Sequence, residues 1–481
     1  MMEEIQWVRD CIKKNVKKIS GFIFTEHPFA GVFLILICFE IPWWFAFWPG
    51  ILQYDSCGQL LQYLGVGKMT GHHPVPVTVL MGLLLDAGRA FFHSDNAGIF
   101  IYVLLQFIAQ CVVLSYGFCV FKRLCLPYWY CWLSLFFYGM FPLLPNWGIS
   151  YEKDSGYYIC FILLTFSMLD IFWMEEEQTA VWRRFVWIAA LVGLSAFRND
   201  GRYVAATAII GAALFCRKYF KASLILGGSC VVLFLFLVEG VYMPFRNIPS
   251  GSVREAMSVP LLQTAAYVKE YQSEITDEEY NAIMSVFEVD DLREISDRYD
   301  RMISDKVKDV FLEYPDKGQL ITYFKLWWGQ LKKHPFFYLK VYWEHCDGYF
   351  KPSEKCFHDV IGRFTILEGQ RRTDEYLDIH FIEEQLNLRL GLERWCYMLY
   401  DFPLTSWLYH TGTYTWIMLG SLLFLIFKKR GQGLFVILPG IVVLMVCTVS
   451  PLNASVRYYL PVMAAAPAYL GICMAEKKKD I

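Results

Sequence analysis

Residues 31–52 read "GVFLILICFEIPWWFAFWPGIL", a run in which Glu40 is the single charged side chain. About 20 residues of α-helix span the hydrocarbon layer of a bilayer. Inside lipid the backbone amides of a segment must find partners within that segment, which favours a helix. The run therefore predicts a membrane-spanning helix over residues 29–50, and further apolar runs of similar length follow it along the chain.

The composition of the chain points to the same class of protein. Its 481 residues are 56% hydrophobic and 18% aromatic but only 19% charged, and the mean hydropathy is +0.35. The net charge of −2 gives no basic surplus for binding nucleic acid. The 15 cysteines lie mostly within apolar runs without metal-type spacing, which predicts buried thiols instead of a zinc site.

Ten spans are predicted, with both termini in the cytoplasm. Lys and Arg favour the cytoplasmic ends of spans, and basic clusters such as 122–123, 183–184 and 428–430 fall at every second junction. The predicted fold is therefore an all-α polytopic membrane protein. Its spans are 29–50, 97–120, 127–144, 155–174, 183–197, 203–217, 222–243, 412–427, 432–450 and 457–475.

Two shorter segments in the first outer loop, residues 51–96, need a separate interpretation. Residues 74–88, "PVPVTVLMGLLLDAG", are apolar but short and begin with two prolines. Counting them as a span would invert the sidedness of every later basic cluster. We therefore expect this segment to be a helix that lies in the outer interface or dips in and returns. Residues 56–68 predict a second interfacial helix.

The charge pattern divides the chain into five parts. Residues 1–28 form a cytoplasmic N-terminal segment, 29–243 an N-terminal transmembrane module, and 412–475 a C-terminal three-helix transmembrane module. Residues 476–481 form a cytoplasmic tail. Between them, residues 244–411 are rich in charge and hold no run long enough to span, so we expect an extracytoplasmic region. That region should be mainly helical, because apolar residues recur every three or four positions over 267–318.

Ionisable side chains gather at the predicted outer mouths of the spans. Charged groups at such depths are costly and tend to face one another or a water-filled cavity. Each group alone also fits a solvated loop, a turn or a side chain that reaches lipid phosphate, but together they predict one outer site. They are Asp55, His72, His73, Lys153, Asp154, Arg198, Asp200 and Arg457.

The motifs that carry these residues resemble those of a known clan. "YDSCGQ", "GHHPV", "EKDSG", "FRNDGRY", "REAMSVPLLQTAAYV" and "PLNASVRYYLP", in this order, are similar to a poorly characterised group of bacterial membrane proteins related to the GT-C glycosyltransferases. The resemblance runs over nearly the whole chain. It implies an enzyme of the bacterial cell membrane that moves a sugar from a polyprenyl-phosphate carrier to an acceptor hydroxyl on the outer face.

The resemblance also implies roles for two of the acids. The clan's catalytic acid in the first outer loop corresponds to Asp55, and its second acid, at the start of the fourth span, to Asp154. Many relatives carry two acids within the first-loop motif, whereas Tyr54 and Ser56 flank Asp55 here. That departure argues against a paired-carboxylate metal site within this loop.

Glycosyl transfer asks for a base and for fixed cations. A carboxylate with a raised pKa would take the proton of the acceptor hydroxyl, and we assign this role to Asp55. Arg457, Arg198 and Lys153 would stabilise the leaving phosphate, with His72 or His73 as hydrogen-bond donors. No cofactor is assigned. A divalent cation is left open, because Asp55 and Asp154 would converge with His72.

Two other classes of function remain open from the sequence. A transporter or lipid flippase for cell-envelope precursors would also be polytopic, but such proteins carry charges near the bilayer midplane and internal repeats. A non-catalytic assembly or sensor protein would use the aromatic-rich residues 323–350 as a contact surface. The predicted partners are a polyprenyl-phosphate-linked sugar, a glycan, lipid or protein acceptor, and membrane lipids, with no nucleic acid.

Overall fold

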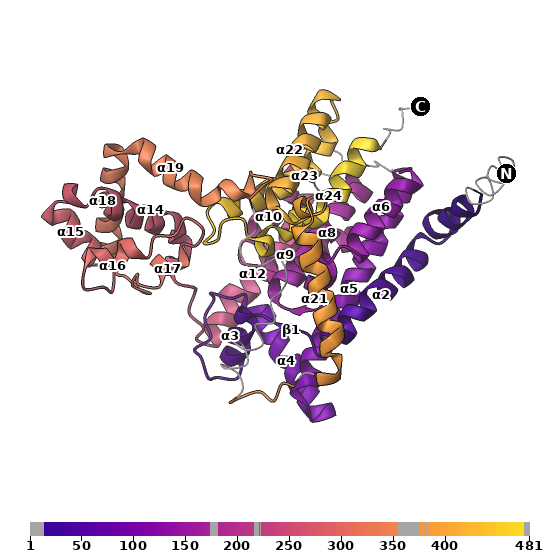
Figure 1. Ribbon diagram of the computed structural model, residues 1–481, viewed down its shortest axis with the longest axis horizontal. Coiled ribbons are helices and arrows are strands. Elements are labelled where there is room, and N and C mark those ends of the chain that lie inside the picture. The colour runs from indigo at the N-terminus through magenta and orange to yellow at the C-terminus, as the bar shows by residue number, and fades with distance from the viewer. Residues whose placement is uncertain are drawn as a thin grey trace.

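A computed structural model describes residues 14–173, 181–215, 221, 223–354, 375–380 and 382–475. The described residues do not include the predicted tail 476–481 or residues 1–13 of the N-terminal segment. They also do not include Arg217 and Lys218, the basic pair at the end of the predicted span 203–217. Long helices form a bundle, and a lobe of shorter helices projects from one side of it (Figure 1).

Nine of the ten predicted spans overlap a helix of the bundle, and the tenth, 222–243, overlaps the separate helix described below. Helix α8 runs through the middle of it, because 89% of its most apolar window is buried against α5, α9 and α24. The bundle helices are α2 (Pro28–Ala46), α5 (Asp95–Arg123), α6 (Tyr128–Gly139), α8 (Lys153–Met168), α9 (Val181–Phe197), α10 (Gly201–Phe215), α22 (Thr411–Phe427), α23 (Gly431–Thr448) and α24 (Val456–Met474).

Five helices among the described residues are long and apolar enough to cross a membrane. They are Pro28–Ala46, Val75–Phe92, Asp95–Arg123, Lys153–Ile171 and Ile225–Phe245. Shorter apolar helices occupy Gly201–Phe215, Thr411–Phe427 and Gly433–Thr448. These helices support an all-α membrane protein, while the number of spans and their sidedness stay predictions.

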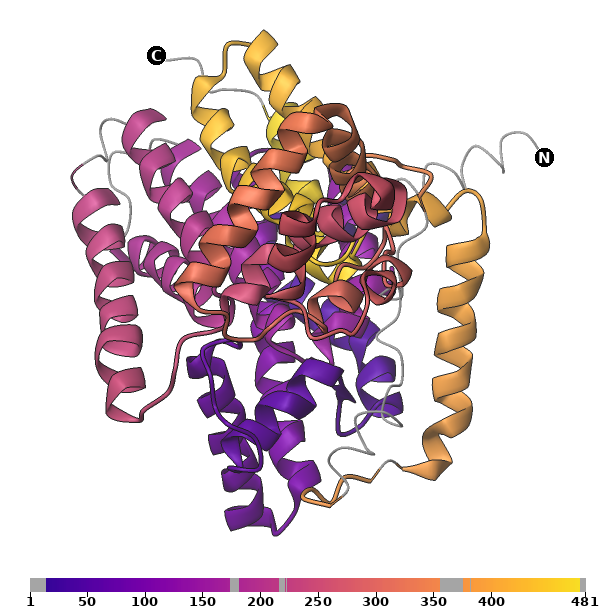
Figure 2. The ribbon, with the colours of Figure 1, turned by 90° about the vertical axis from the view of Figure 1, so that its left-hand side faces the viewer.

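The helix over residues 225–245 stands at the edge of the bundle. It alternates between π-helix and α-helix in η4 (Ser223–Gly228), α12 (Ser229–Leu235), η5 (Phe236–Tyr242) and α13 (Met243–Phe245). Only 11% of its most apolar window is buried, and Figure 2 shows it as a separate rod beside the other helices. We call residues 225–245 the edge helix.

Both segments of the first outer loop that were predicted as interfacial form helices. They are α3 (Tyr54–Tyr63) and α4 (Val75–Phe92). Helix α4 is longer than predicted, and its length alone would let it cross a membrane. It packs tightly on α5 because glycines meet at the crossing, where a Cβ on Gly88 would lie 2.1 Å from the backbone nitrogen of Gly98.

A short parallel pair of strands joins two distant loops. Strand β1 (Ile51–Leu52) pairs with β2 (Ser150–Tyr151), with Ile51 opposite Ser150 and Leu52 opposite Tyr151. No sequence pattern predicted these strands. Since α3 begins just after β1 and α8 just after β2, the pairing places the first turns of the two helices side by side.

The region between the two transmembrane modules forms the lobe and one long helix. The predicted helical stretch 267–318 is broken into short helices, because turns and a bridge between Phe287 and Phe311 interrupt it. The lobe comprises η6 (Val253–Met257), α14 (Ser258–Glu270), η7 (Gln272–Glu274), α15 (Asp277–Met284), α16 (Leu292–Asp297), α17 (Asp305–Lys308), α18 (Lys317–Lys333), α19 (Pro335–Cys346) and η8 (Asp347–Tyr349).

Helix α21 (Leu386–Asp401) follows η9 (Glu383–Gln385), runs along the outside of the bundle and leads through η10 (Ser406–Tyr409) into α22 (Figure 2). Arg389 of α21 donates a hydrogen bond from Nε to the carbonyl of Ala46, at the end of α2, over 3.0 Å. The rings of Trp395 and Trp43 lie 6.4 Å apart. These contacts hold α21 beside α2.

Candidate active site

A polar cavity of about 570 Å³ lies where the bundle meets the lobe. The first turns of α3, α8 and α24, the turn before α4, the α9–α10 turn and the lobe contribute to its walls. Seven of the eight predicted site residues line it, and the eighth, Asp154, is buried just behind. The seven are Asp55, His72, His73, Lys153, Arg198, Asp200 and Arg457.

Asp55 contacts two cations from distant parts of the chain. Its Oδ2 accepts a hydrogen bond from Lys153 Nζ over 2.6 Å and another from Arg457 Nη1 over 3.3 Å. The strand pairing brings Asp55 and Lys153 together, and α24, whose first turn is capped by Ser455, brings Arg457. Three separate segments therefore meet at one carboxylate.

The pKa of Asp55 differs from the prediction. Burial raises it, but the charges of Lys153 and Arg457, with His73, outweigh burial and hold the pKa well below the ordinary aspartate value. The predicted raised pKa of Asp55 is therefore wrong for this arrangement, because no sequence pattern contains the distance to its cationic neighbours. Asp55 is ionised at neutral pH.

Glu152 belongs to the same cluster, although it was not among the residues predicted for the site. It is fully buried, and its Oε2 accepts a hydrogen bond from Ser56 Oγ over 2.9 Å. Its Oε1 accepts from the backbone nitrogen and Nζ of Lys153, over 3.1 and 3.2 Å. Burial raises its pKa, as do the neighbouring acids, against the opposing charge of Lys153. Its position directly before α8, where acidic caps are favoured, was the available signal.

Asp154 is held by arginines behind the cavity wall. Its Oδ1 accepts from Arg198 Nη1 over 2.5 Å, and its Oδ2 lies 3.7 Å from Arg457 Nε. The guanidinium of Arg198 also donates to Asp200 Oδ1 over 2.8 Å. This guanidinium lies over two rings, with its carbon 5.3 Å from the centroid of Tyr157 and 5.0 Å from that of Tyr458. Aromatic faces and carboxylates thus fix its plane.

The two histidines have different environments. His73 is 9% exposed, and burial, with the nearby charge of Lys153, lowers its pKa to about 3. It is therefore neutral and offers one donor and one acceptor. The ring of His72 is more exposed and lies 3.9 Å from Glu255 of the lobe. Asn199 fixes their turn by donating to the carbonyls of Gly71 and His72 over 2.9 and 3.1 Å.

Three carboxylates lie close enough to share one cation. Within the described residues, oxygens of Asp55, Glu152 and Asp154 lie within 4.8 Å of one another. His72, which the sequence left open as a further ligand, is not part of this group, because its ring turns toward Glu255. Oxygen donors suit Mg²⁺ or Mn²⁺. However, Lys153 Nζ lies 2.6, 3.2 and 4.0 Å from the three carboxylates, so an ammonium already serves them.

The lobe supplies a charged wall whose residues were not predicted for the site. Lys308, which is 5% exposed, donates to Glu255 over 2.6 Å and to Asp305 over 3.0 Å. Although burial raises the pKa of Glu255, Lys308 holds it below the ordinary value. The motif "REAMSVP" carries Arg254 and Glu255, but no neighbouring residue in the sequence reveals that they line the same cavity as Asp55.

The fold and this cavity define a helical protein with long apolar helices and a buried network of carboxylates and cations at one end of the bundle. The chain belongs to a family of unknown function, DUF6020, whose model matches residues 66–481. No curated protein and no solved structure matches the chain.

Proposed function

We propose that the protein is a GT-C-type glycosyltransferase that moves a sugar from a polyprenyl-phosphate carrier to an acceptor hydroxyl on the outer face of the bacterial membrane. The observation that carries the proposal is the convergence of Asp55, Lys153, Arg198 and Arg457 in one cavity at the end of the bundle. Under the proposed topology of ten spans, with both termini in the cytoplasm, this end faces outward.

The cations of the cavity suit the leaving group. As the bond between the anomeric carbon and the phosphate oxygen breaks, the phosphate keeps the electron pair and its negative charge grows. Preorganised donors that meet such charge are commonly worth about 2.7–4 kcal/mol each in barrier height. Arg457 and Lys153 reach the cavity from different elements, and the neutral His73 adds a donor.

Asp55 suits the role of base once the donor is bound. The acceptor oxygen forms its bond to the anomeric carbon while its proton passes to Asp55. In the free protein, Lys153 and Arg457 depress the pKa of Asp55. A bound phosphate would share those two cations, so the pKa of Asp55 would rise and its basicity with it. Donor binding would thereby activate the base.

Replacing Asp55 by Asn tests this role. The change keeps the shape of the side chain and removes the proton acceptor, so transfer of radiolabelled sugar from a polyprenyl-phosphate donor should fall by about 10²–10⁴-fold. The matched control is Asp300→Asn, because Asp300 is a lobe carboxylate that pairs with Lys306 and does not line the cavity. The assay uses purified protein in lipid nanodiscs and screens a panel of donor sugars.

Near-normal transfer by the Asp55→Asn protein would remove Asp55 from the base role. If the wild-type protein moved a lipid-linked sugar across vesicles without transferring it to any acceptor, the transporter alternative would hold instead.

A further inference from the structure

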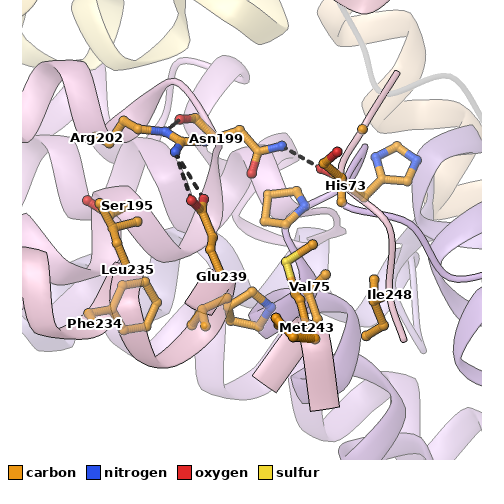
Figure 3. Close-up of a pocket in the computed structure, with 17 residues that line it drawn as sticks. His73, Val75, Ser195, Asn199, Arg202, Phe234, Leu235, Glu239, Met243 and Ile248 are labelled. Carbon is orange, nitrogen blue, oxygen red and sulfur yellow. Dashed lines mark hydrogen bonds and ion pairs between the residues drawn. The ribbon is translucent and has the colours of Figure 1, made fainter. Parts of the chain in front are cut away.

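A second cavity of about 270 Å³ adjoins the polar cavity. The two cavities share His73, Pro74 and Asn199 among their lining residues, so they adjoin at the turn before α4. Away from that turn the walls of the second cavity are mixed, with apolar side chains beside the charged Arg202 and Glu239. Figure 3 shows Val75 and Met243 beside one another there, with Phe234 and Leu235 on the edge helix. We call this second cavity the side cavity.

A single, weakly packed helix separates the side cavity from the surroundings of the bundle. The edge helix supplies Phe234, Leu235, Val238, Glu239, Met243 and Pro244 to the cavity wall, while side chains such as Leu233 on its other face are exposed. Leu237, next to Val238, is 50% exposed. In a membrane the outward face would contact lipid, so hydrocarbon lies on the far side of one helix.

An ion pair fastens the edge helix to the site. Arg202 Nη1 donates to both carboxylate oxygens of Glu239, over 3.0 and 3.3 Å, and Arg202 Nε donates to the carbonyl of Asn199 over 2.7 Å (Figure 3). Glu239 lies within η5, a π-helical segment of an otherwise apolar helix. Ionisable groups within spans are costly and mark functional positions, and π-helical segments frequently occur at functional sites.

We infer that the side cavity is a lateral portal for the hydrocarbon chain of a lipid whose anionic head lies in the polar cavity. The edge helix covers this portal, and the Arg202–Glu239 ion pair, which we call the latch, holds the helix in place. The inference rests on the proposed function for the identity of the head group, a phosphate held by the cations. A strongly polar cavity that adjoins one with Phe234, Val238 and Met243 in its wall matches an amphiphile.

The physical need for such a portal follows from the chain of the lipid. A head group that enters the polar cavity from the aqueous side would pull its hydrocarbon chain out of the bilayer, at a cost that grows with every methylene exposed to water. A lateral opening lets the chain stay in an apolar environment throughout. Because the bilayer is as apolar as the portal, the portal acts by giving access and does not add hydrophobic affinity.

Filling the portal tests the inference. Val238→Trp places a large ring in the side cavity, and Leu237→Trp, the matched control, places the same ring on the outward face of the same helix. Two probes are compared in nanodiscs: a long-chain polyprenyl phosphate, and dimethylallyl phosphate, which keeps the head with one isoprene unit. Val238→Trp should weaken binding of the long-chain probe by about 10-fold and leave the short probe within about twofold, while Leu237→Trp changes neither.

The outcomes separate the portal from the proposed function. Unchanged long-chain binding by the Val238→Trp protein would overturn the portal and leave the function standing, and so would equal weakening of both probes. If the wild-type protein bound neither probe, the proposed function would fail, and the inference would fall with it.

The latch has its own readout, the dissociation rate of the long-chain probe. Glu239→Gln and Arg202→Gln should each increase the dissociation rate measurably, by up to about 10-fold. The double exchange Arg202→Glu with Glu239→Arg should restore the slow rate. Glu344→Gln, which breaks the Lys340–Glu344 pair on the lobe, is the control and should have no effect. Dissociation that is unchanged in both single variants would overturn the latch.

Discussion

At the level of single residues, Lys153 holds three acids together in the polar cavity. Its ammonium contacts Asp55 and Glu152 directly and lies 4.0 Å from Asp154. Truncating one partner of a buried charge network leaves like charges close together with little water to screen them. Lys153 thus stands where a divalent cation would stand in a carboxylate metal site, and its charge makes such a cation unnecessary for the fold.

Removing Lys153 should therefore create a metal site. The Lys153→Ala protein should unfold at a lower temperature than the wild type, and Mn²⁺ should restore much of the loss. A cation at 100 times its dissociation constant stabilises by about 2.7 kcal/mol. Thermal unfolding with and without Mn²⁺, after treatment with EDTA, measures this. Stabilisation of the wild type by Mn²⁺, with none in the variant, would contradict the prediction.

The pKa of Asp55 makes a prediction about pH dependence. The ionised form is the base, so activity is lost as the pH falls through its pKa. The profile of kcat/KM reports the free protein, and that of kcat reports the donor complex. Since free Asp55 has a lowered pKa that rises when phosphate shares its cations, the acid limb of kcat should lie at higher pH than that of kcat/KM. The reverse order would contradict activation by the donor.

At the level of elements, the hairpin of α4 and α5 positions the histidine turn. Helix α4 begins at Val75, directly after His72 and His73, and its far end crosses α5 where Gly88 meets Gly98. Added bulk at this crossing has no room, because the neighbouring atoms are backbone. Displacement of α4 would therefore reach the cavity through the turn.

Gly88→Ala should destabilise the protein by about 1–3 kcal/mol, the usual cost of overpacking. Gly420→Ala is the control, since Gly420 is an exposed position in α22 with nothing within 4 Å of an added Cβ; it should be neutral or stabilising by up to about 1 kcal/mol. Thermal unfolding of both variants in detergent measures the difference. Equal stabilities would show that the crossing is looser than described.

The sequence predicted the helices better than it predicted the contacts between them. Apolar length alone located the helices of the bundle, because the bilayer criterion is local. The strand pair, Glu152 and the wall made by Glu255 and Lys308 depend on partners roughly 50–100 residues away, which no local pattern contains. For the same reason the direction of the pKa shift of Asp55 was beyond reach.

At the level of the whole molecule, the lobe and the bundle are joined next to the cavity. The backbone nitrogen of Ser304 donates to the carbonyl of Pro451 over 2.9 Å, and that of Asn453 donates to Met302 over 3.0 Å. Asn453 Nδ2 also donates to Asp347 over 3.1 Å. Pro451 and Asn453 directly precede α24, which carries Arg457. Any movement of the lobe would therefore shift the start of α24 and with it Arg457, one of the cations of the cavity.

The sidedness of the molecule can be tested with two epitope tags, one inserted after Lys68 and one after Lys429. In the ten-span topology an antibody should reach the first tag on intact spheroplasts and the second only after permeabilisation, because the cluster 428–430 lies in the cytoplasm. If α4 crossed the membrane, as its length permits, the second tag would be reached from outside. A first tag that is inaccessible from outside would place the polar cavity on the cytoplasmic face.

The pairing of β1 with β2 also limits how the chain can vary in length. Asp55 comes three residues after Leu52, and Lys153 two residues after Tyr151, its partner in register. One residue inserted into either connection would turn the following helix by about 100° and carry the carboxylate or the ammonium away from the other. Insertions and deletions should thus be tolerated in the turn over residues 64–70 but forbidden in these two connections, whatever residues fill them.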